Sequence, residues 1–331
     1  MINFFSDFLR ASASFDITAG SIISIPLTIA IMEAPILNKL NISDNIFLNV
    51  LKTRYDVKVL TEVYENTKID LLLYSCFYSN EEYNFIKSVN CKKLYYSGEN
   101  DFPNFNICDY AMTQNRFEFD NRHFYLPYWF MSQLHCENDT LYVDIDTNGI
   151  DDRNLLNRDF CSFVVSNNFC SMPIRTKIFN EISKYKQVAS GGKYLNNIGG
   201  PVKDKKEFLQ KYKFNIASEN SIVNGYITEK LVDAFNAHTV PIYVGPNDVI
   251  NEFNPASFIN LNDFASFEDL LMYIERVDTD DELYMNMLKA PKIKDGVIES
   301  LQKQFIDFLF FAVEDKRKFN HKYGRIGLLN G

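Results

Sequence analysis

The 331-residue chain has 46% hydrophobic and 15% aromatic residues, enough to form two packed cores, so we expect a globular protein with two domains. Its formal net charge of -9 argues against a nucleic-acid partner, because nucleic-acid phosphates attract basic protein faces. A nucleotide sugar stays compatible with this charge, since two or three local cations are enough to bind one.

The chain has six cysteines, and none of them forms the CxxC pair that is typical of zinc and redox sites. We interpret them as reduced, mostly buried thiols of a cytosolic protein. Residues 1–10 lack the basic start and apolar run of a secretory signal. The longest uncharged apolar stretch, residues 17–32, contains Gly20 and Pro26 and is shorter than the ~20 residues that a membrane span requires.

In the first half of the chain, short apolar strands alternate with helices. Strands are predicted at residues 27–31, 57–60, 69–75, 92–96, 110–112 and 124–127, and helices after Ser43 and at 81–89. This alternation predicts a parallel sheet with helices on its faces. We assign residues 1–150 to this first domain.

A polar, acidic segment at residues 135–157 is interpreted as the interdomain linker. It contains Asp144 and Asp146, whose DxD spacing matches a known metal-binding motif. No strand and loop pattern surrounds the pair, so a solvated linker is the preferred interpretation and no metal site is predicted.

The second half, residues 151–296, begins another α/β domain. A strand at 161–166 precedes a helix that Pro173 opens, and a strand at 213–217 leads through a polar loop into a further helix and a strand at 240–243. The apolar stripe of that further helix consists of Ile227, Leu231, Ala234 and Phe235. The glycines near residue 195 do not spell the GxGxxG dinucleotide fingerprint.

Two of these helices carry a cation in their first turn, where the helix dipole favours acidic residues. The cations are Arg175 and Lys230. A lone first-turn lysine commonly turns its ammonium group to solvent. Two such cations favour a phosphate clamp, because free N–H groups at a helix start already attract anions.

The ordered runs 219–221, 225–231, 240–243 and 253–259 resemble the donor-binding signature of the α1,3/4-fucosyltransferases, glycosyltransferase family 10, and most closely its bacterial, Helicobacter-type branch. The resemblance implies an α/β fold of the GT-B type, with two Rossmann-like domains facing a cleft. We assign residues 297–331 to a C-terminal helix, at about 297–313, and a basic tail, and by analogy with that fold we expect the helix to cross back to the first domain.

The resemblance also implies roles for seven residues. Glu99 follows the strand at 92–96 in a run similar to the acceptor-domain motif, and would be the general base; in isolation it would be a solvated loop carboxylate. Arg175 and Lys230 match the positions that bind the diphosphate. The predicted donor-binding set is Arg175, Glu219, Asn220, Tyr226, Glu229 and Lys230. No cofactor and no metal are implied.

The expected reaction is inverting transfer of L-fucose from GDP-fucose to a hydroxyl of an N-acetylglucosamine-containing, lactosamine-type glycan, with an α1,3 linkage favoured. Two alternatives stay open: transfer from another GDP-deoxyhexose, and a non-catalytic protein that binds glycans or nucleotide sugars. We expect a bacterial cytoplasmic location. A basic cluster in the tail could contact the inner membrane or be merely solvated, and consists of Lys316, Arg317, Lys318, Lys322 and Arg325.

Overall fold

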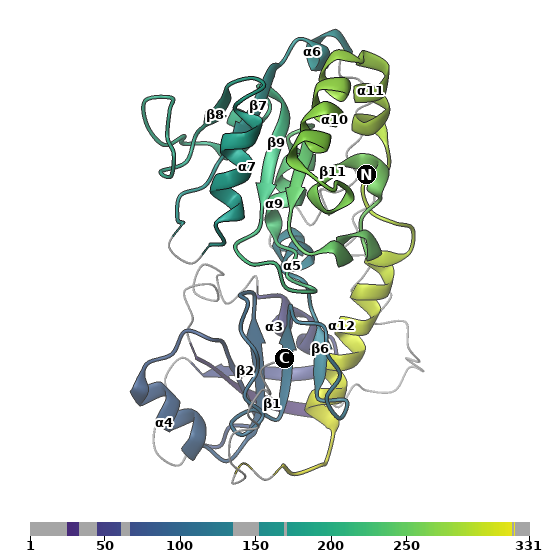
Figure 1. Cartoon of the computed structure of the whole chain (residues 1–331). Coiled ribbons are helices and arrows are strands. Elements are labelled where there is room, and N and C mark those ends of the chain that lie inside the picture. The colour runs from purple at the N-terminus through teal and green to yellow at the C-terminus, as the bar shows by residue number, and fades with distance from the viewer. Residues whose placement is uncertain are drawn as a thin grey trace. The chain divides into compact units, whose positions relative to one another are not determined.

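The computed structural model describes residues 25–32, 45–60, 67–134, 152–168, 171–319 and 321. The described residues separate into two compact units (Figure 1). The first contains the described residues up to 127, residues 133–134 and those from 299 onward, and the second contains residues 128–132 and 152–298. These units differ from the predicted ranges, because a short piece near residue 130 joins the second unit and the C-terminal helix joins the first.

The first unit is built on a six-stranded parallel sheet in the order β2-β1-β3-β4-β5-β6. Its strands are β1 (Ile25–Ile31), β2 (Tyr55–Leu60), β3 (Leu71–Tyr74), β4 (Lys92–Ser97), β5 (Tyr110–Thr113) and β6 (His123–Tyr125). The chain adds strands outward from β1 in both directions, so the order reverses between β1 and β3. In open parallel sheets such a switch point is where ligands bind, beyond the carboxyl ends of the strands.

The C-terminal helix α12 (Val297–Glu314) packs on this first sheet together with α3 (Ile46–Lys52), whereas α4 (Asn80–Ser88) follows β3 (Figure 1). The ring of Phe47 on α3 lies 5.5 Å from that of Phe305 on α12 and 5.2 Å from that of Tyr96 on β4. The Glu314 carboxylate, at the end of α12, accepts hydrogen bonds from Arg54 at 2.6 Å and the Tyr55 hydroxyl at 2.8 Å. The predicted return of the C-terminal helix is confirmed.

The residues after α12 stay on the first unit. The Tyr110 hydroxyl donates to the Asp315 carboxylate, and Lys92 Nζ donates to the Asp315 carbonyl at 2.5 Å. Arg317 of the basic cluster pairs with Asp315 at 2.5 Å and with Asp120 at 3.3 Å. Lys316 and Lys318 are exposed, and Lys322 and Arg325 lie outside the described residues. Among the helices that the structure describes, none is both long and apolar enough to span a bilayer.

The second unit has a five-stranded parallel sheet in the order β11-β10-β9-β7-β8. Its strands are β7 (Asp159–Phe163), β8 (Val188–Ser190), β9 (Tyr212–Ser218), β10 (Val240–Val244) and β11 (Ile259–Asn260). Here the order reverses between β7 and β9. The strands β8 and β11 were not predicted, because segments of three and two residues are too short to show a period.

Helices cover both faces of the second sheet. The main core packs apolar side chains of β7, β9 and β10 against α7 (Ile174–Ile182), α10 (Phe267–Thr279) and α11 (Asp281–Lys289). On the opposite face, α8 (Lys205–Leu209) supplies Phe208 and Leu209 to a smaller cluster, and α9 (Glu229–Asn236) packs on β9 and β10. The intervening one-turn helices are η2 (Asn247–Asn251), η3 (Pro255–Ser257) and η4 (Leu261–Asp263).

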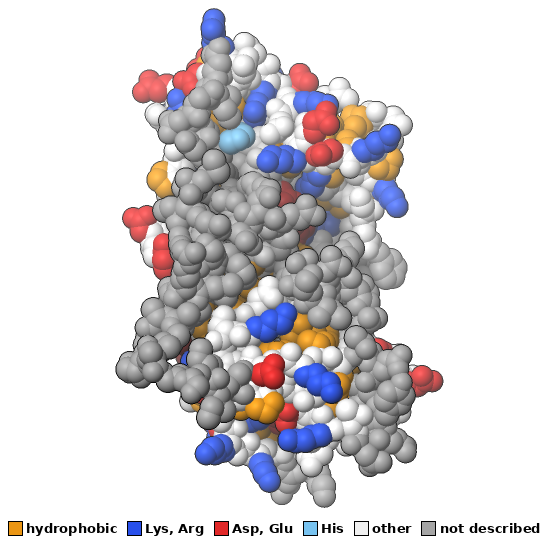
Figure 2. Space-filling view, turned by 180° about the vertical axis from the view of Figure 1, so that it is seen from behind, with side chains coloured by type: hydrophobic (Ala, Val, Ile, Leu, Met, Phe, Trp, Pro, Cys, Tyr) orange, Lys and Arg blue, Asp and Glu red, His pale blue; other side chains and the backbone are white. Residues whose placement is uncertain are grey.

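The structure describes residues 152–157 of the predicted linker at 135–157, and these residues differ from the prediction. Residues 152–156 form helix α6 (Asp152–Leu156), and the preceding helix α5 (Tyr128–Leu134) was not predicted. The DxD pair, Asp144 and Asp146, lies outside the described residues. On the face shown in Figure 2, basic and acidic side chains of the described residues lie intermingled.

Candidate active site

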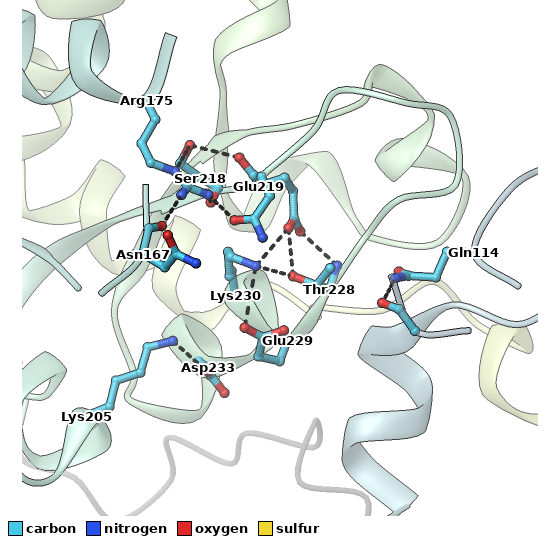
Figure 3. A network of polar contacts seen from close by, with 12 residues as sticks. Gln114, Asn167, Arg175, Lys205, Ser218, Glu219, Thr228, Glu229, Lys230 and Asp233 are labelled. Carbon is cyan, nitrogen blue, oxygen red and sulfur yellow. Dashed lines mark hydrogen bonds and ion pairs between the residues drawn. The ribbon is translucent and has the colours of Figure 1, made fainter. Parts of the chain in front are cut away.

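The tripeptide Ser218-Glu219-Asn220 connects the two predicted first-turn cations (Figure 3). It lies where β9 ends, beside the end of β7, and these two strands flank the switch point of the second sheet. Arg175 binds the first and third members of the tripeptide, and Lys230 binds the second. The structure therefore brings the two cations to one edge of the sheet, where open α/β sheets bind ligands.

Arg175 is almost fully buried, with 1% of its surface exposed, and hydrogen bonds hold its guanidinium group in place. Nη2 donates to the Ser218 carbonyl at 2.9 Å and to Asn220 Oδ1 at 2.5 Å, whereas Nη1 donates to the Asn167 carbonyl at 3.3 Å. Within the described chain these acceptors are neutral, and no carboxylate forms an ion pair with Arg175. A buried charge is costly without a counter-ion, so this guanidinium favours an anionic ligand nearby.

Lys230 has the opposite surroundings, because two carboxylates pair with it. Nζ lies 3.2 Å from Glu219 Oε2 and 3.5 Å from Glu229 Oε1, and it donates to Thr228 Oγ1 at 2.8 Å. Burial works to lower the pKa of Lys230, but the charges of Glu219 and Glu229 outweigh it and raise that pKa above its usual range. With 19% of the side chain exposed, Lys230 is a fixed cation that still reaches the surface.

The side chain of Glu219 is completely buried, and its contacts explain how helix α9 begins. Oε1 accepts from the Thr228 backbone N–H at 2.8 Å, and Oε2 accepts from the Thr228 hydroxyl at 2.7 Å. The carboxylate thus accepts from the backbone N–H of the N-cap residue Thr228, whose own side chain makes no cap hydrogen bond. Glu219 was predicted to bind the nucleotide-sugar donor. In the structure its carboxylate contacts Thr228 and Lys230, and these contacts orient Lys230 and the first turn of α9.

The remaining residues that were predicted to bind the sugar donor lie in the same region. Glu229 is the first residue of α9, and its side chain is 34% exposed. Burial acts to raise the pKa of Glu229, but the charges of Lys230 and Lys205 lower it overall, so the carboxylate stays ionised. Asn220 is half-buried, whereas Tyr226 is buried at 2% exposure. Gly225, just before Tyr226, has φ 88°, a conformation that favours glycine.

Glu99 lies in the first unit, two residues beyond β4, in a loop whose successive residues are held by hydrogen bonds. Gln114, labelled in Figure 3, donates through Nε2 to the Gly98 carbonyl. The Glu99 N–H donates to Ser97 Oγ at 3.1 Å. Asn115 then donates to Asn100 Oδ1 at 3.2 Å. The Glu99 side chain is half-buried. These contacts fix the backbone of a carboxylate that remains accessible, as a general base requires.

Among the described residues, no group of three or more His, Cys, Asp and Glu side chains is arranged to hold a metal ion. The described charged side chains at the end of β9 are two cations with two carboxylates. Such cations can stabilise a departing diphosphate by charge-assisted hydrogen bonds.

Five residues of this region were not predicted from the sequence: Thr228, Asn167, Ser218 and the pair Lys205 and Asp233. Thr228 had an available signal, because threonine is a preferred residue just before a helix. Asn167 and Ser218 contact Arg175 mainly through their carbonyl groups, which every residue has, so no residue type could identify them. Lys205 pairs with Asp233 at 2.6 Å beside α9, a contact between residues 28 apart in sequence (Figure 3).

Comparison with family models matches both units. Residues 157–297 match the model described as glycosyltransferase family 10 (fucosyltransferase) C-term, and residues 34–132 match the model described as the alpha-(1,3)-fucosyltransferase FucT N-terminal domain.

Curated relatives share about a third of their residues with the matched parts of this chain. The alpha-(1,3)-fucosyltransferase FucT of Helicobacter pylori is 35% identical over 226 residues, which cover 60% of this chain and 47% of that protein. The mouse 4-galactosyl-N-acetylglucosaminide 3-alpha-L-fucosyltransferase 9 is 38% identical over 116 residues, covering 34% of this chain and 32% of the mouse protein. The matches thus span less than half the length of these relatives.

Solved structures match nearly the whole chain. A crystal structure of an alpha1,3-fucosyltransferase is 28% identical with a TM-score of 0.75, and the match covers 92% of this chain and 95% of that chain. A crystal structure of alpha1,3-fucosyltransferase with GDP-fucose is 28% identical with a TM-score of 0.72, covering 94% and 96%. The predicted fold class, two Rossmann-like α/β domains of the GT-B type, is therefore confirmed.

Proposed function

The chain belongs to glycosyltransferase family 10, the fucosyltransferases, and on that premise we propose that it transfers L-fucose from GDP-fucose to a glycan hydroxyl. The observation that carries the donor assignment is the joint attachment of Arg175 and Lys230 to the tripeptide at the end of β9. Both cations are held in place by hydrogen bonds to the protein itself, so little ordering is needed when a diphosphate binds.

The two cations would share the diphosphate unequally. Lys230 is partly exposed and can donate directly, as a charge-assisted hydrogen bond worth about 1.5–3 kcal/mol. Arg175 is nearly enclosed, and Asn220 is the half-buried side chain among its partners, so a phosphate oxygen would replace Asn220 Oδ1 as its acceptor. Glu229, one third exposed and ionised, would accept from ribose hydroxyls, and Tyr226 would support the guanosine side of the site.

In the proposed reaction, Glu99 takes the proton from the acceptor hydroxyl. The acceptor oxygen forms a bond to the anomeric carbon of fucose while that carbon's bond to the phosphate oxygen breaks, which inverts the configuration. GDP departs with the bonding electron pair, and the two cations stabilise its negative charge. A base in this role typically contributes about 10²–10⁴ in rate.

We propose an N-acetylglucosamine-containing acceptor and an α1,3 linkage. The mouse relative is named a 4-galactosyl-N-acetylglucosaminide 3-alpha-L-fucosyltransferase, and the Helicobacter relative is named an alpha-(1,3)-fucosyltransferase. Incubation with GDP-fucose and a panel of lactosamine-type acceptors, with the product linkage read by NMR, tests both points. A product at another position would contradict the linkage, and a failure of every such acceptor would contradict the acceptor class.

Two measurements separate this proposal from its alternatives, which are a different sugar donor and a binding protein without activity. Mass spectrometry of products from a panel of GDP-deoxyhexoses would reveal a different donor by a larger yield than from GDP-fucose. A protein that binds GDP-fucose but neither transfers nor hydrolyses it with any acceptor would be a binding protein, contrary to this proposal.

We propose that transfer needs no metal ion, because the two cations can stabilise the departing diphosphate. Excess chelator should leave the rate unchanged, and a loss of activity that added divalent cations restore would contradict this view.

We also propose a bacterial cytoplasmic location with peripheral contact at the inner membrane through the tail. Exposed Lys316 and Lys318 would each contribute about 1 kcal/mol at an anionic surface. Cosedimentation with anionic vesicles but not with neutral ones is expected, and equal recovery with both would contradict the contact.

A further inference from the structure

Exposed aromatic side chains cluster at one place in the first unit. In the described part of the chain, four large aromatic residues have more than a third of their surface exposed: Phe77 at 47%, Tyr78 at 37%, Phe102 at 43% and Phe311 at 40%. The first three, called here the aromatic platform, belong to the two loops that follow β3 and β4. Single exposed aromatics are ordinary on a protein surface, but a cluster in neighbouring loops indicates a binding surface.

The two loops lie next to each other. The strands β3 and β4 pair in parallel, so both loops leave the same edge of the sheet, and β3 flanks the switch point. A chain of contacts joins the loops: the Tyr78 ring lies 6.2 Å from that of Tyr74, the Tyr74 ring lies 5.3 Å from that of Tyr95, and the Tyr95 hydroxyl donates to Asp101.

The platform lies beside the candidate base. Asp101, which is exposed, donates its backbone N–H to the Glu99 carbonyl at 2.8 Å, and Phe102 follows directly. Burial raises the pKa of the Cys76 thiol, which precedes Phe77, and the charges of Asp101 and Glu99 raise it further. The Cys76 thiol on the first loop thus lies within electrostatic range of Asp101 and Glu99 on the second.

The platform is braced from beneath as well. The ring of Phe102 lies 5.8 Å from that of Phe117, which stacks on His123 at 3.8 Å. The ring of Tyr78 stacks on Tyr83 at 5.9 Å. These contacts limit rotamer freedom, so little side-chain entropy is lost when a ligand binds.

The chemistry of this surface fits a sugar ring. A pyranose presents an apolar C–H face, which covers an aromatic ring, and hydroxyl donors at its edge, which suit carboxylates that only accept. A stable protein partner buries about 800 Å² per side, more than three side chains provide. The carboxylates of Glu99 and Asp101 also disfavour an anionic membrane surface.

We propose that Phe77, Tyr78 and Phe102 form the subsite on which the acceptor sugar stacks, with Asp101 accepting from a hydroxyl of that ring. The subsite aligns the acceptor hydroxyl with Glu99, and so this inference rests on the proposed fucosyl transfer. Its occupant is a neutral pyranose of the acceptor glycan.

The test compares Phe77→Ala, Tyr78→Ala and Phe102→Ala with the matched control Phe311→Ala, which removes the fourth exposed aromatic of the same unit. Each platform variant should raise the KM for N-acetyllactosamine about three- to tenfold, with kcat and the Kd for GDP within about twofold of wild type. The control should leave all three values unchanged, and thermal melts identify any variant that fails to fold. Unchanged acceptor KM in all three platform variants, or an equal rise in the control, would overturn the subsite.

Saturation-transfer NMR with N-acetyllactosamine separates this inference from the activity. Magnetisation transfer to the sugar that weakens in the platform variants supports the subsite even if no fucose is transferred, in which case the proposed function alone fails. Transfer of fucose with no change in sugar saturation across the variants leaves the function standing and overturns the subsite. Concentration-dependent self-association that the platform substitutions abolish, without sugar saturation, would assign the surface to a second copy of this chain instead.

Discussion

The two units present different surfaces at the carboxyl ends of their sheets. In the second unit the site is made of charged side chains that are largely enclosed: Glu219 pairs with Lys230, and Arg175 is hydrogen-bonded to neutral groups of the same tripeptide. In the first unit the corresponding edge carries the half-buried Glu99 and an exposed aromatic platform. An enclosed network suits a ligand of constant shape such as a nucleotide, whereas exposed rings suit sugar rings that vary from glycan to glycan.

The comparison also indicates where a mutation should act. A change in the enclosed network should alter donor affinity and thermal stability together, because its buried polar groups are hydrogen-bonded to one another. A change at the exposed edge should alter catalysis or acceptor binding alone. The following substitutions test that separation, beginning with the largest expected effect.

Glu99→Gln removes the proposed base and keeps the size of the side chain. We expect transfer to fall by about 10²–10⁴, because no other group would take the acceptor proton. The Kd for GDP, measured by calorimetry, should stay within a few fold of wild type, since Glu99 belongs to the other unit. Full activity in this variant would remove Glu99 from the mechanism.

Lys230→Ala removes the partly exposed cation. GDP affinity should weaken about 10- to 150-fold, the equivalent of one lost charge-assisted hydrogen bond. The matched control is Lys205→Ala, which removes a neighbouring lysine paired with Asp233 at 2.6 Å. If calorimetry found equal losses of GDP affinity in both variants, general loss of positive charge would explain the result, contrary to a specific contact.

Glu219→Gln keeps an oxygen for the Thr228 N–H and removes the charge that faces Lys230. GDP affinity should fall less than in Lys230→Ala, because the ammonium group stays but is held less firmly. The melting temperature should fall too, since a carboxylate of the network is lost. An unchanged melting temperature and unchanged GDP affinity would show that Glu219 does not position Lys230.

The ion pair of Glu219 and Lys230 should also make stability depend on pH. The folded pKa of Lys230 is raised above its unfolded value near 10.5, so the stabilisation is fully present below that pH and is lost as pH rises through the higher folded value. The difference in melting temperature between wild type and Glu219→Gln should therefore stay constant from about pH 7 to 10 and narrow above 10.5. A difference that changes between pH 7 and 10 would point to another titrating group.

His123 gives the smallest expected effect, below neutral pH. Burial lowers the pKa of its ring to about 4, despite a hydrogen bond to the Phe117 carbonyl that raises it. The folded state thus binds fewer protons than the unfolded state between about pH 6.5 and 4, and stability should fall as pH falls through that window. His123→Phe keeps a ring on Phe117 and should flatten this dependence, measured as melting temperature against pH. An identical slope in both proteins would exclude His123 as its source.

Much of the fold followed from patterns within short segments. The segment from β9 to β10 was predicted correctly as a strand, a loop, a helix and a strand. Each of these elements buries one face, and the spacing of its apolar residues along the sequence indicates which face that is. The first-turn positions of Arg175 and Lys230 were equally local, since a helix start can be located from its own residues. The family signature then connected these positions to a nucleotide sugar.

Tertiary structure decided what the sequence by itself could not. The contacts between Arg175 and Ser218 join residues 43 apart, and the burial of Glu219 depends on α9 and β9 packing together. The return of α12 to the first unit and the meeting of the loops after β3 and β4 likewise depend on chain topology. A residue's type and spacing determine its local conformation and its chemical capability, but its burial and its partners arise only when distant segments pack, because hydrogen bonds and ion pairs form through space.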